Sequence, residues 1–152
     1  MKRMKTKKIN LTVIFLLLLP LGIALFGAGC EKEDVSQSVL NGKWILIGFG
    51  DDSTNEFIIE PESEPKSSYV VFDNGEMVPY SVTNMTYDVS YEVEGEMIHI
   101  TNKGGRTKVG GDTEWGLKFL IAINDIYNFK INSELMLYYE NQKFMKLKKE
   151  TK

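Results

Sequence analysis

The sequence predicts an α+β fold that is mainly β: an antiparallel domain of about eight strands with one helix near its C-terminal third. From residue 42 onward, short runs rich in Val, Ile, Tyr, Phe and Trp alternate with clusters of Gly, Asn, Asp and Ser, as is typical of antiparallel β proteins. Only residues 114–125 carry apolar side chains at convincing helical spacing. A chain of 152 residues, 43% of them hydrophobic, is long enough for one small domain with one core.

The first half of the domain is expected to contain strands at residues 43–49, 69–72 and 76–80. The acidic segment 53–66 between the first two holds two prolines and is predicted to be a loop. Asp73-Asn74-Gly75 predicts a tight turn, because Asn and Gly tolerate a positive φ. Pro79 has no backbone N–H to donate, so it predicts that the third strand lies at a sheet edge.

The clearest strand signal lies in residues 87–94, where apolar and acidic side chains alternate. Tyr87, Val89, Tyr91 and Val93 are predicted to face the core, while the polar residues between them face water. Gly95 then turns the chain into a strand at residues 97–101. The glycine-rich residues 103–111 are predicted to form a loop.

The helix is predicted to begin near Glu114, with Asp112 or Thr113 as its cap. Leu117, Leu120 and Ile121 share one face of the helix, with Phe119, Ala122 and Ile126 beside it. Three further strands are expected to complete the domain, at residues 127–131, 135–139 and 144–148.

Residues 1–29 have the pattern of an export signal. Five basic side chains lie within residues 1–8, and an apolar stretch follows from Leu11 to Phe26. A helix of about 16 residues is roughly 24 Å long, which is shorter than the hydrocarbon core of about 30 Å, so a permanent transmembrane span is the weaker interpretation. Small residues fitted to a peptidase cleft then lead to Cys30, the only cysteine of the chain.

The segment Phe26-Gly27-Ala28-Gly29-Cys30 resembles the lipobox of bacterial lipoproteins, although the family usually has Leu at the position of Gly27. The resemblance implies lipidation of Cys30, and more than one acyl chain gives a stable membrane anchor. Residues 30–40 are expected to be the lipidated cysteine and a flexible tether. Lys32-Glu33-Asp34 resembles the signal that places Bacteroidota lipoproteins on the outer face of the outer membrane. A periplasm-facing domain behind a plain spacer is the alternative.

Several motifs follow one another between residues 40 and 148. Leu40-Asn41-Gly42-Lys43-Trp44 resembles the Leu-x-Gly-x-Trp opening of META-domain (HslJ-like) proteins, and residues 114–123 resemble that family's Glu-x-x-Phe-Leu-x-Ala-Leu helix. Thr83, where many members have Cys, and the longer acidic loop indicate a divergent branch of a Bacteroidota type. For residues 41–149 the resemblance implies a small antiparallel β barrel-like domain with one packed helix. It implies no established enzymatic activity, and it implies a link to envelope stress.

The composition of the expected mature chain excludes several partners. Without the leader, 13 basic and 21 acidic side chains remain, a net charge of −8. Nucleic acid is therefore not expected as a partner, because its binding depends on basic side chains that neutralise phosphates. A single cysteine allows no internal disulfide and no CxxC metal or redox motif. No cofactor is expected.

Neither a catalytic set nor a metal site is predicted. His99 is the only histidine, and its alternation with two isoleucines predicts that it faces solvent, without a nucleophile beside it. Zinc sites usually need several His or Cys ligands. Asp88, Glu92 and Glu94 form an outward carboxylate row, which is interpreted as a solvated face; glycoside hydrolysis and calcium binding are the alternatives.

Two polar segments are interpreted as loops. One is acidic and lacks the ligand spacing of an EF-hand, although ion binding by residues 51–64 is left open; its carboxylates are Asp51, Asp52, Glu56, Glu60, Glu62 and Glu64. The other places Arg106 and Lys108 between glycine pairs (Gly104-Gly105 and Gly110-Gly111) without the Walker pattern.

Three further side chains are given structural roles. Trp44 and Trp115 are expected to be core anchors, and Asn84 is expected to hydrogen-bond a loop to the barrel. None of these interpretations identifies a ligand-binding residue.

The leading functional hypothesis is a non-enzymatic envelope lipoprotein that binds an envelope protein, a glycan or another molecule through its loops. A carboxylate-dependent surface hydrolase and a stress-protective structural protein are the alternatives. Two carboxyl groups converging in a cleft, about 5 to 9.5 Å apart, would favour the hydrolase.

Overall fold

The computed structural model describes residues 37–63 and 68–151. The predicted signal peptide and Cys30 lie outside the described residues. Within the described ranges, no helix is long and apolar enough to cross a membrane.

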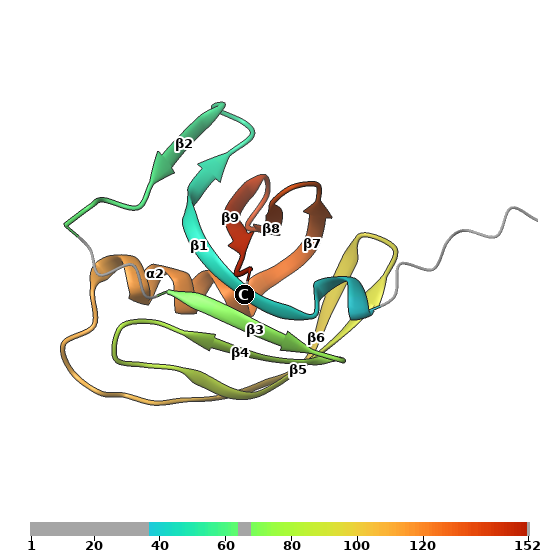
Figure 1. Cartoon of the computed structure of the whole chain (residues 1–152), viewed down its shortest axis with the longest axis horizontal. Helices are drawn as coiled ribbons and strands as arrows, with labels where there is room; N and C mark the ends of the chain where they lie inside the picture. Colours follow the sequence, from blue (N-terminus) through green and yellow to red (C-terminus); the bar gives the residue numbers. More distant parts are fainter. Residues whose placement is uncertain (1–36, 64–67, 152) are drawn as a thin grey trace, which may run out of the picture. The chain divides into compact units, whose positions relative to one another are not determined.

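Eight antiparallel strands close into a barrel, because β1 pairs with β3 on one side and with β9 on the other (Figure 1). This confirms the predicted fold class of a mainly β, barrel-like domain with one helix. The barrel strands are β1 Gly42–Asp51, β3 Tyr69–Asp73, β4 Glu76–Tyr80, β5 Thr86–Glu94, β6 Met97–Arg106, β7 Ile126–Ile131, β8 Leu135–Tyr139 and β9 Lys143–Lys149. Closure removes the free edges that an open sheet would expose.

A ninth strand, β2 Glu56–Ile59, lies outside the barrel within the segment that the sequence predicts to be a loop. The first half of β1 pairs with β3, and its second half pairs with β2. A register shift between Leu46 and Gly48 turns β1 at this point, so that Phe49 rather than its neighbours faces the core. The long β1 therefore serves the barrel and the β1–β2 hairpin together.

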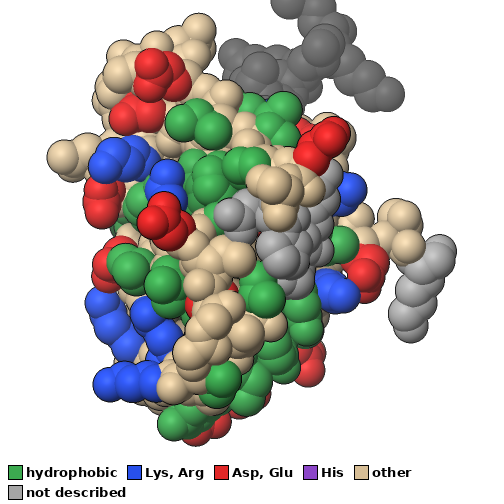
Figure 2. All heavy atoms as spheres, turned by 90° about the vertical axis from the view of Figure 1, so that its left-hand side faces the viewer, with side chains coloured by type: hydrophobic (Ala, Val, Ile, Leu, Met, Phe, Trp, Pro, Cys, Tyr) green, Lys and Arg blue, Asp and Glu red, His purple; other side chains and the backbone are tan. Residues whose placement is uncertain are grey.

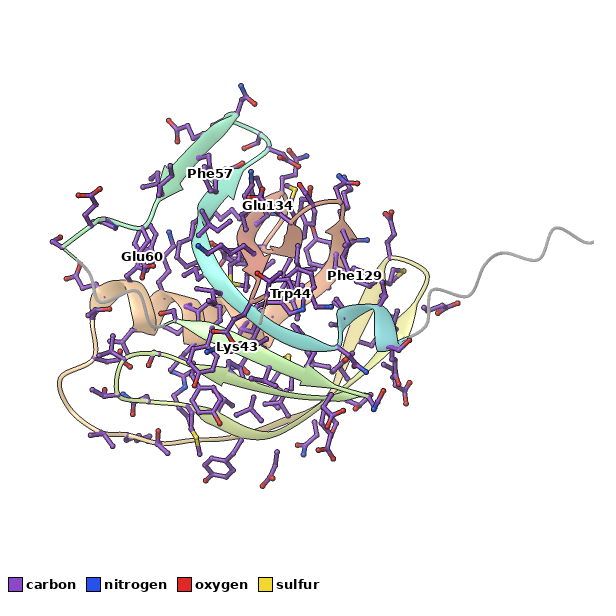
Figure 3. All side chains as sticks on the ribbon, viewed as in Figure 1. Lys43, Trp44, Phe57, Glu60, Phe129 and Glu134 are labelled. Atoms are coloured by element: carbon purple, nitrogen blue, oxygen red, sulfur yellow. The ribbon has the colours of Figure 1, made fainter. Side chains whose placement is uncertain are left out.

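The core fills the barrel interior with large apolar side chains. Trp44, Phe72 and Phe129 are at most 3% exposed, and Trp44 and Phe129 lie among the strands in Figure 3. The indole N–H of Trp44 donates to the Leu40 carbonyl over 2.6 Å. The 3-10 helix η1 Gln37–Leu40 thus packs on the barrel, although the sequence predicts a tether over residues 30–40. The expected role of Trp44 as a core anchor is confirmed.

Helix α2 Glu114–Ala122 continues into the 3-10 helix η2 Ile123–Asp125, within the predicted range. Thr113 is the cap, and its side chain accepts a hydrogen bond from the Gly116 N–H over 2.9 Å. The apolar residues of the helix are not all buried: Phe119 and Leu120 are fully buried, whereas Leu117 is 41% and Ile121 56% exposed. The helix is apolar on two sides, and only one of them meets the barrel.

Two predictions for the strands fail for local reasons. Pro79 does not lie at a sheet edge: it pairs with Val70, and the β4–β5 ladder is open beside it, so its missing N–H leaves no gap in the pairing. Tyr87 is 42% exposed rather than buried, because Asp88 adopts a φ of 57° and reverses the alternation of β5. The inward positions there are Thr86, Val89 and Tyr91.

Strand β6 is longer than the predicted strand at residues 97–101, and its last part takes in the first half of the predicted glycine-rich loop. Tyr87 and Gly105 lie opposite each other in the β5–β6 ladder. A Cβ atom at Gly105 would come within 2.6 Å of the Tyr87 ring, so a glycine is needed for the ring to lie there. The sequence shows glycines at this place without showing what they accommodate.

Candidate ligand-binding groove

The chemical candidates that the sequence offers lie at separate places in the described part of the chain. His99 is exposed, as predicted, and faces Glu92 across the β5–β6 ladder. Asp88, Glu92 and Glu94 are exposed as well, which fits the predicted solvated face. Among the described residues, no three His, Cys, Asp or Glu side chains gather closely enough to hold a metal ion.

The acidic segment forms a hairpin with its own hydrogen bonds. The Asp51 carboxylate accepts from the backbone N–H of Ser53 over 2.8 Å and from the Ser53 hydroxyl, which lowers its pKa. Asp52 accepts from the Tyr138 hydroxyl over 3.2 Å. Glu60 is buried, and Glu64 lies outside the described residues. These contacts tie the hairpin to the barrel at β8.

Asn84 connects a loop to the barrel, as the sequence predicts. Its amide Nδ2 donates to the Val109 carbonyl and to the Asp112 carboxylate, both over 2.9 Å. Its Oδ1 accepts from the Val109 N–H over 2.7 Å and from the Thr107 hydroxyl over 3.2 Å. Ser81 also donates to Asp112. The second half of the predicted glycine-rich loop is therefore held by one buried amide.

The same network sets the charge of Asp112. Burial raises the pKa of this carboxyl, but hydrogen bonds from Ser81, Asn84 and two backbone N–H groups outweigh burial, so the pKa of Asp112 lies below its ordinary value. Asp112 remains ionised at neutral pH. It acts as an acceptor within the network rather than as a proton donor.

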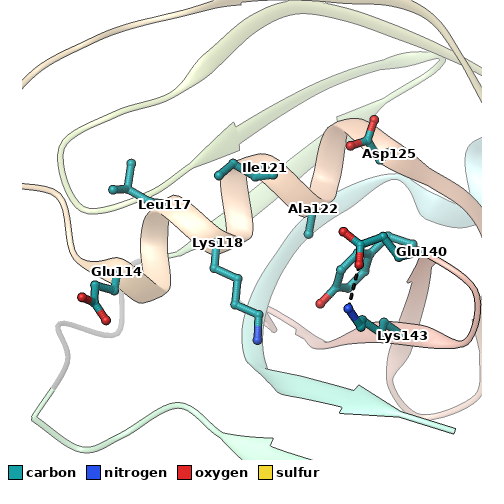
Figure 4. A pocket seen from close by; sticks show the side chains of 9 residues that line it. Glu114, Leu117, Lys118, Ile121, Ala122, Asp125, Glu140 and Lys143 are labelled. Carbon is teal, nitrogen blue, oxygen red and sulfur yellow. Dashed lines mark hydrogen bonds and ion pairs between the residues drawn. The ribbon is translucent and has the colours of Figure 1, made fainter. Parts of the chain in front are cut away.

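A groove of about 450 Å³ lies between α2 and the turn from β8 to β9 (Figure 4). We call it the α2 groove. Its volume is within the range of about 300 to 1,000 Å³ that small-molecule sites occupy. Nine side chains line the α2 groove: Glu114, Leu117, Lys118, Ile121, Ala122, Asp125, Tyr139, Glu140 and Lys143. The two exposed apolar residues of the helix, Leu117 and Ile121, are thus part of its wall.

Lys118 is the cation at the centre of this arrangement. Its Nζ lies 4.1 Å from the centre of the Phe49 ring and 5.7 Å from that of Trp115, and the two rings meet edge to face at 4.9 Å. Burial lowers the pKa of Lys118 and the nearby charge of Lys143 lowers it further, while the charge of Glu140 opposes them in part. No carboxylate within the described ranges forms an ion pair with it.

The opposite wall carries groups that are already paired. Lys143 and Glu140 form an ion pair of 2.7 Å, and Lys118 extends toward it from α2 (Figure 4). This hydrogen bond, together with the Glu140 charge, raises the pKa of Lys143. Tyr139 is 5% exposed, and burial raises its pKa to about 12, aided by the charges of Glu140 and Asp51. Of the two lysines that line the α2 groove, Lys118 is therefore the one without an ion pair among the described residues.

Two smaller hollows adjoin the α2 groove. One of about 120 Å³ shares Lys118, Tyr139 and Lys143 with it and reaches Ile58 of β2. Another, of about 280 Å³, shares Glu140 and Lys143 and reaches Asp51. The first of these hollows extends from Lys118 of α2 to the β1–β2 hairpin.

Sequence reasoning misses this site because its parts lie far apart in the chain. Trp115, given as a core anchor, is partly buried and contributes a ring beside Lys118. Lys118 itself looks like an ordinary exposed helix position in the sequence. The signal that was available is the second apolar side of the helix, where Leu117 and Ile121 occur.

The comparisons with known proteins show the fold and no more. No protein family model matches the chain, and no curated protein matches it. An NMR structure of a protein from Burkholderia xenovorans is similar at a TM-score of 0.54 and 15% identity, covering 76% of this chain and 87% of that chain. A crystal structure of a DUF4847 family protein from Bacteroides vulgatus has a TM-score of 0.49 and 15% identity, covering 74% of this chain and 95% of that chain.

The similarity to the Burkholderia protein agrees with the small domain described above. At 15% identity it carries no information on ligands or activity. The META-domain resemblance remains a prediction from sequence motifs.

Proposed function

We propose that this chain is a non-enzymatic lipoprotein of the bacterial outer membrane, a META-like module anchored through Cys30, which binds an amphiphilic anion in the α2 groove. The leader and its lipobox-like end support the anchoring. The observation that carries the binding function is Lys118, a cation without a carboxylate partner in the described part of the chain, held in an open groove between aromatic rings.

The charge of the ligand follows from Lys118. A partly buried ammonium group with a lowered pKa gains most from an anion, since a charge-assisted hydrogen bond compensates for lost hydration. The neighbouring Lys143 is neutralised by Glu140, so one negative charge on the ligand suffices. The acidic side chain of Glu114, which also lines the groove, disfavours ligands with several negative charges, whereas Asp125 is paired with Lys103.

The rest of the ligand follows from the groove wall. Leu117 and Ile121 leave apolar surface open to water next to the cation. Covering this surface with an aliphatic or aromatic part contributes about 25 cal/mol per Å² buried. A carboxylate with a short hydrocarbon chain combines both features. The carboxylate row of β5 does not line the α2 groove.

Octanoate tests this assignment through the reactivity of Lys118. Because its pKa is lowered, Lys118 holds more neutral amine at pH 8 to 9 than Lys130 or Lys143, whose pKa values are raised. We expect an amine-acylating reagent to modify Lys118 faster than these two, as read by peptide mass spectrometry on the full chain in lipid nanodiscs. Bound octanoate stabilises the ammonium form, so it should slow the reaction at Lys118 at least fivefold.

Matched probes and variants separate this binding from general partitioning into lipid. Octylammonium and propionate should leave the Lys118 rate unchanged, because each lacks one of the two features. Replacing Lys118 with Met should weaken octanoate binding about tenfold, the effect of losing one charge-assisted hydrogen bond. The exposed Lys108→Met variant should bind normally. Equal protection by octanoate and octylammonium would refute the anionic ligand.

Membrane attachment depends on Cys30 in this proposal. The Cys30→Ala variant is expected to lose lipidation, so that no processed protein remains in the membrane fraction after cell fractionation. Lys32→Ala leaves the cysteine in place and should remain in the membrane. Processed Cys30→Ala protein that stays in the membrane would contradict the lipid anchor, whatever the outcome with octanoate.

A further inference from the structure

Strand β2 leaves one edge of the sheet unpaired. Within residues 37–63 and 68–151, it stands at the end of the strand order and pairs only with β1, while the other eight strands close the barrel (Figure 1). Exposed edge strands offer backbone N–H and C=O groups to another strand, and proteins usually protect them with charged residues, prolines or bulges. β2 has the sequence EFII, without any of these between Glu56 and Glu60.

The pairing with β1 identifies the backbone groups at the free edge. The Glu60 N–H donates to the Ile47 carbonyl over 2.9 Å, and residues in antiparallel strands alternate between facing the partner and facing away. With Phe49 opposite Ile58, the inward residues of the hairpin are 56, 58 and 60. Phe57 and Ile59 therefore present their N–H and C=O groups to the outside.

The strand is held firmly enough to serve as a template. The Phe57 ring stacks on the Phe144 ring, with 6.1 Å between the ring centres and 6° between the ring planes. Lys146 Nζ lies 4.7 Å from the centre of the Phe57 ring. Gly48 and Gly50 provide the space, since a Cβ at either would come within 2.3 Å of Ile58 or Phe144. Figure 3 shows Phe57 on the hairpin, away from the core residue Trp44.

The side chains at the edge are apolar and open to water. Ile58 is 58% and Ile59 64% exposed, and Phe57 is 37% exposed. On the face shown in Figure 2, hydrophobic side chains lie beside acidic ones at the top, the end of the view at which the β1–β2 hairpin stands in Figure 1. An apolar, unpaired strand is a surface for strand addition.

The charge around β2 selects the kind of partner. Asp51, Asp52, Glu56 and Glu62 surround the strand, and no Lys or Arg occurs between residues 44 and 65. Of the nearby cations, Lys143 and Lys146 are paired with Glu140 and Glu134, and Lys118 lies on the α2 side of the hollow that Ile58 lines. A second copy would bring the same acidic side chains of the hairpin toward one another, and like charges brought together disfavour pairing of two β2 strands.

We propose that the free edge of β2 accepts an extended segment of another protein, with alternating apolar residues between basic flanks, as an added antiparallel strand. Backbone hydrogen bonds to Phe57 and Ile59 give the affinity, and the acidic hairpin attracts the basic flanks. This surface is separate from the ligand of the α2 groove, so either proposal can fail alone.

A synthetic peptide tests the surface on the full chain in lipid nanodiscs. By fluorescence anisotropy we expect labelled KKVTVTVKK to bind, and EEVTVTVEE to bind at least tenfold more weakly. N-methylation of the three Val residues or of the two Thr residues removes alternate N–H groups. Because only one set faces β2, one methylated peptide should lose at least tenfold in affinity and the other less than twofold. Equal affinities of the two methylated peptides would overturn strand addition.

Variants of Ile59 give the corresponding test on the protein. Ile59→Pro removes a free-edge N–H without breaking a bond to β1, and edge strands tolerate proline, so peptide affinity should fall at least fivefold. Ile59→Ala shortens the side chain but keeps the backbone N–H. This variant should therefore lose less peptide affinity than Ile59→Pro. Lys118→Met should bind the peptide normally. A peptide affinity equal to that of the wild type in Ile59→Pro would overturn the proposal. If that variant folds poorly, the methylated peptides still test strand addition, because they are measured on the wild-type chain.

Discussion

The Asn84→Ala variant is expected to lose about 3 to 4 kcal/mol of unfolding free energy, because each buried group left without a partner costs about 1 to 3 kcal/mol. Asn84 is 6% exposed, and its amide satisfies the Val109 N–H and C=O and one oxygen of Asp112. Alanine fills none of these positions, and the loss falls at the lower end of the range for three groups because these hydrogen bonds are part-buried. Denaturant unfolding measures the loss.

Exposed asparagine provides the control for this prediction. Asn102 also makes two side-chain hydrogen bonds, to the Asp88 carbonyl at 2.7 Å and from the Gly104 N–H at 3.2 Å, but in an exposed position. Asn102→Ala should cost well under 1 kcal/mol, since water can take over both bonds. Similar losses in the two variants would show that burial of Asn84 is not the cause.

Acid should act on the same network. The pKa of Asp112 is lowered in the folded protein, so its contribution to stability is present above its unfolded pKa of about 4 and is lost as the pH falls through the lower folded value. Asn84→Ala removes one of the hydrogen bonds that keep this pKa low. The variant should therefore lose less stability than the wild type on acidification from pH 5 to pH 2.

The strands could be predicted because their signals are local. The alternation in β5 and the Asn74-Gly75 turn each depend on neighbouring residues, and both Asn74 and Gly75 adopt positive φ angles. The predicted inward position of Tyr87 is wrong because it depends on a contact with a residue far away in the sequence. The φ of 57° at Asp88 turns Tyr87 outward over Gly105, and that partner is 18 residues away in the sequence.

The candidate sites depend on such distant contacts even more. Lys118 contacts the Phe49 ring, and the charge of Lys143 lowers its pKa. Phe49 in β1 and Lys143 in β9 are neighbours because these two strands close the barrel. β2 is missed because its three-residue apolar run, Phe57 to Ile59, lies within an acidic segment, where composition favours a loop. By contrast, the role of Asn84 could be predicted, since a lone polar residue between strand and turn indicated a loop contact. Closure of the barrel is implied only by resemblance, because no local pattern specifies that β1 meets β9.

Glycine at position 104 is the second place where a small change should have a large effect. Its φ is +61°, and a Cβ atom there would lie 1.9 Å from the Tyr87 carbonyl oxygen, within the backbone of β5. The left-handed conformation alone costs an alanine about 1 to 2 kcal/mol. The clash adds a strand displacement of the kind that costs about 1 to 3 kcal/mol in overpacked sites. We expect Gly104→Ala to lose about 3 kcal/mol or more.

Gly95 separates the two contributions, because it has the same φ of +61° and no atom within 4 Å of a Cβ. Gly95→Ala should therefore cost only the conformational part, about 1 to 2 kcal/mol, in the same denaturant experiment. The difference between the variants measures how closely β6 approaches the reversed segment at Asp88. Equal losses would mean that β5 moves freely away from β6.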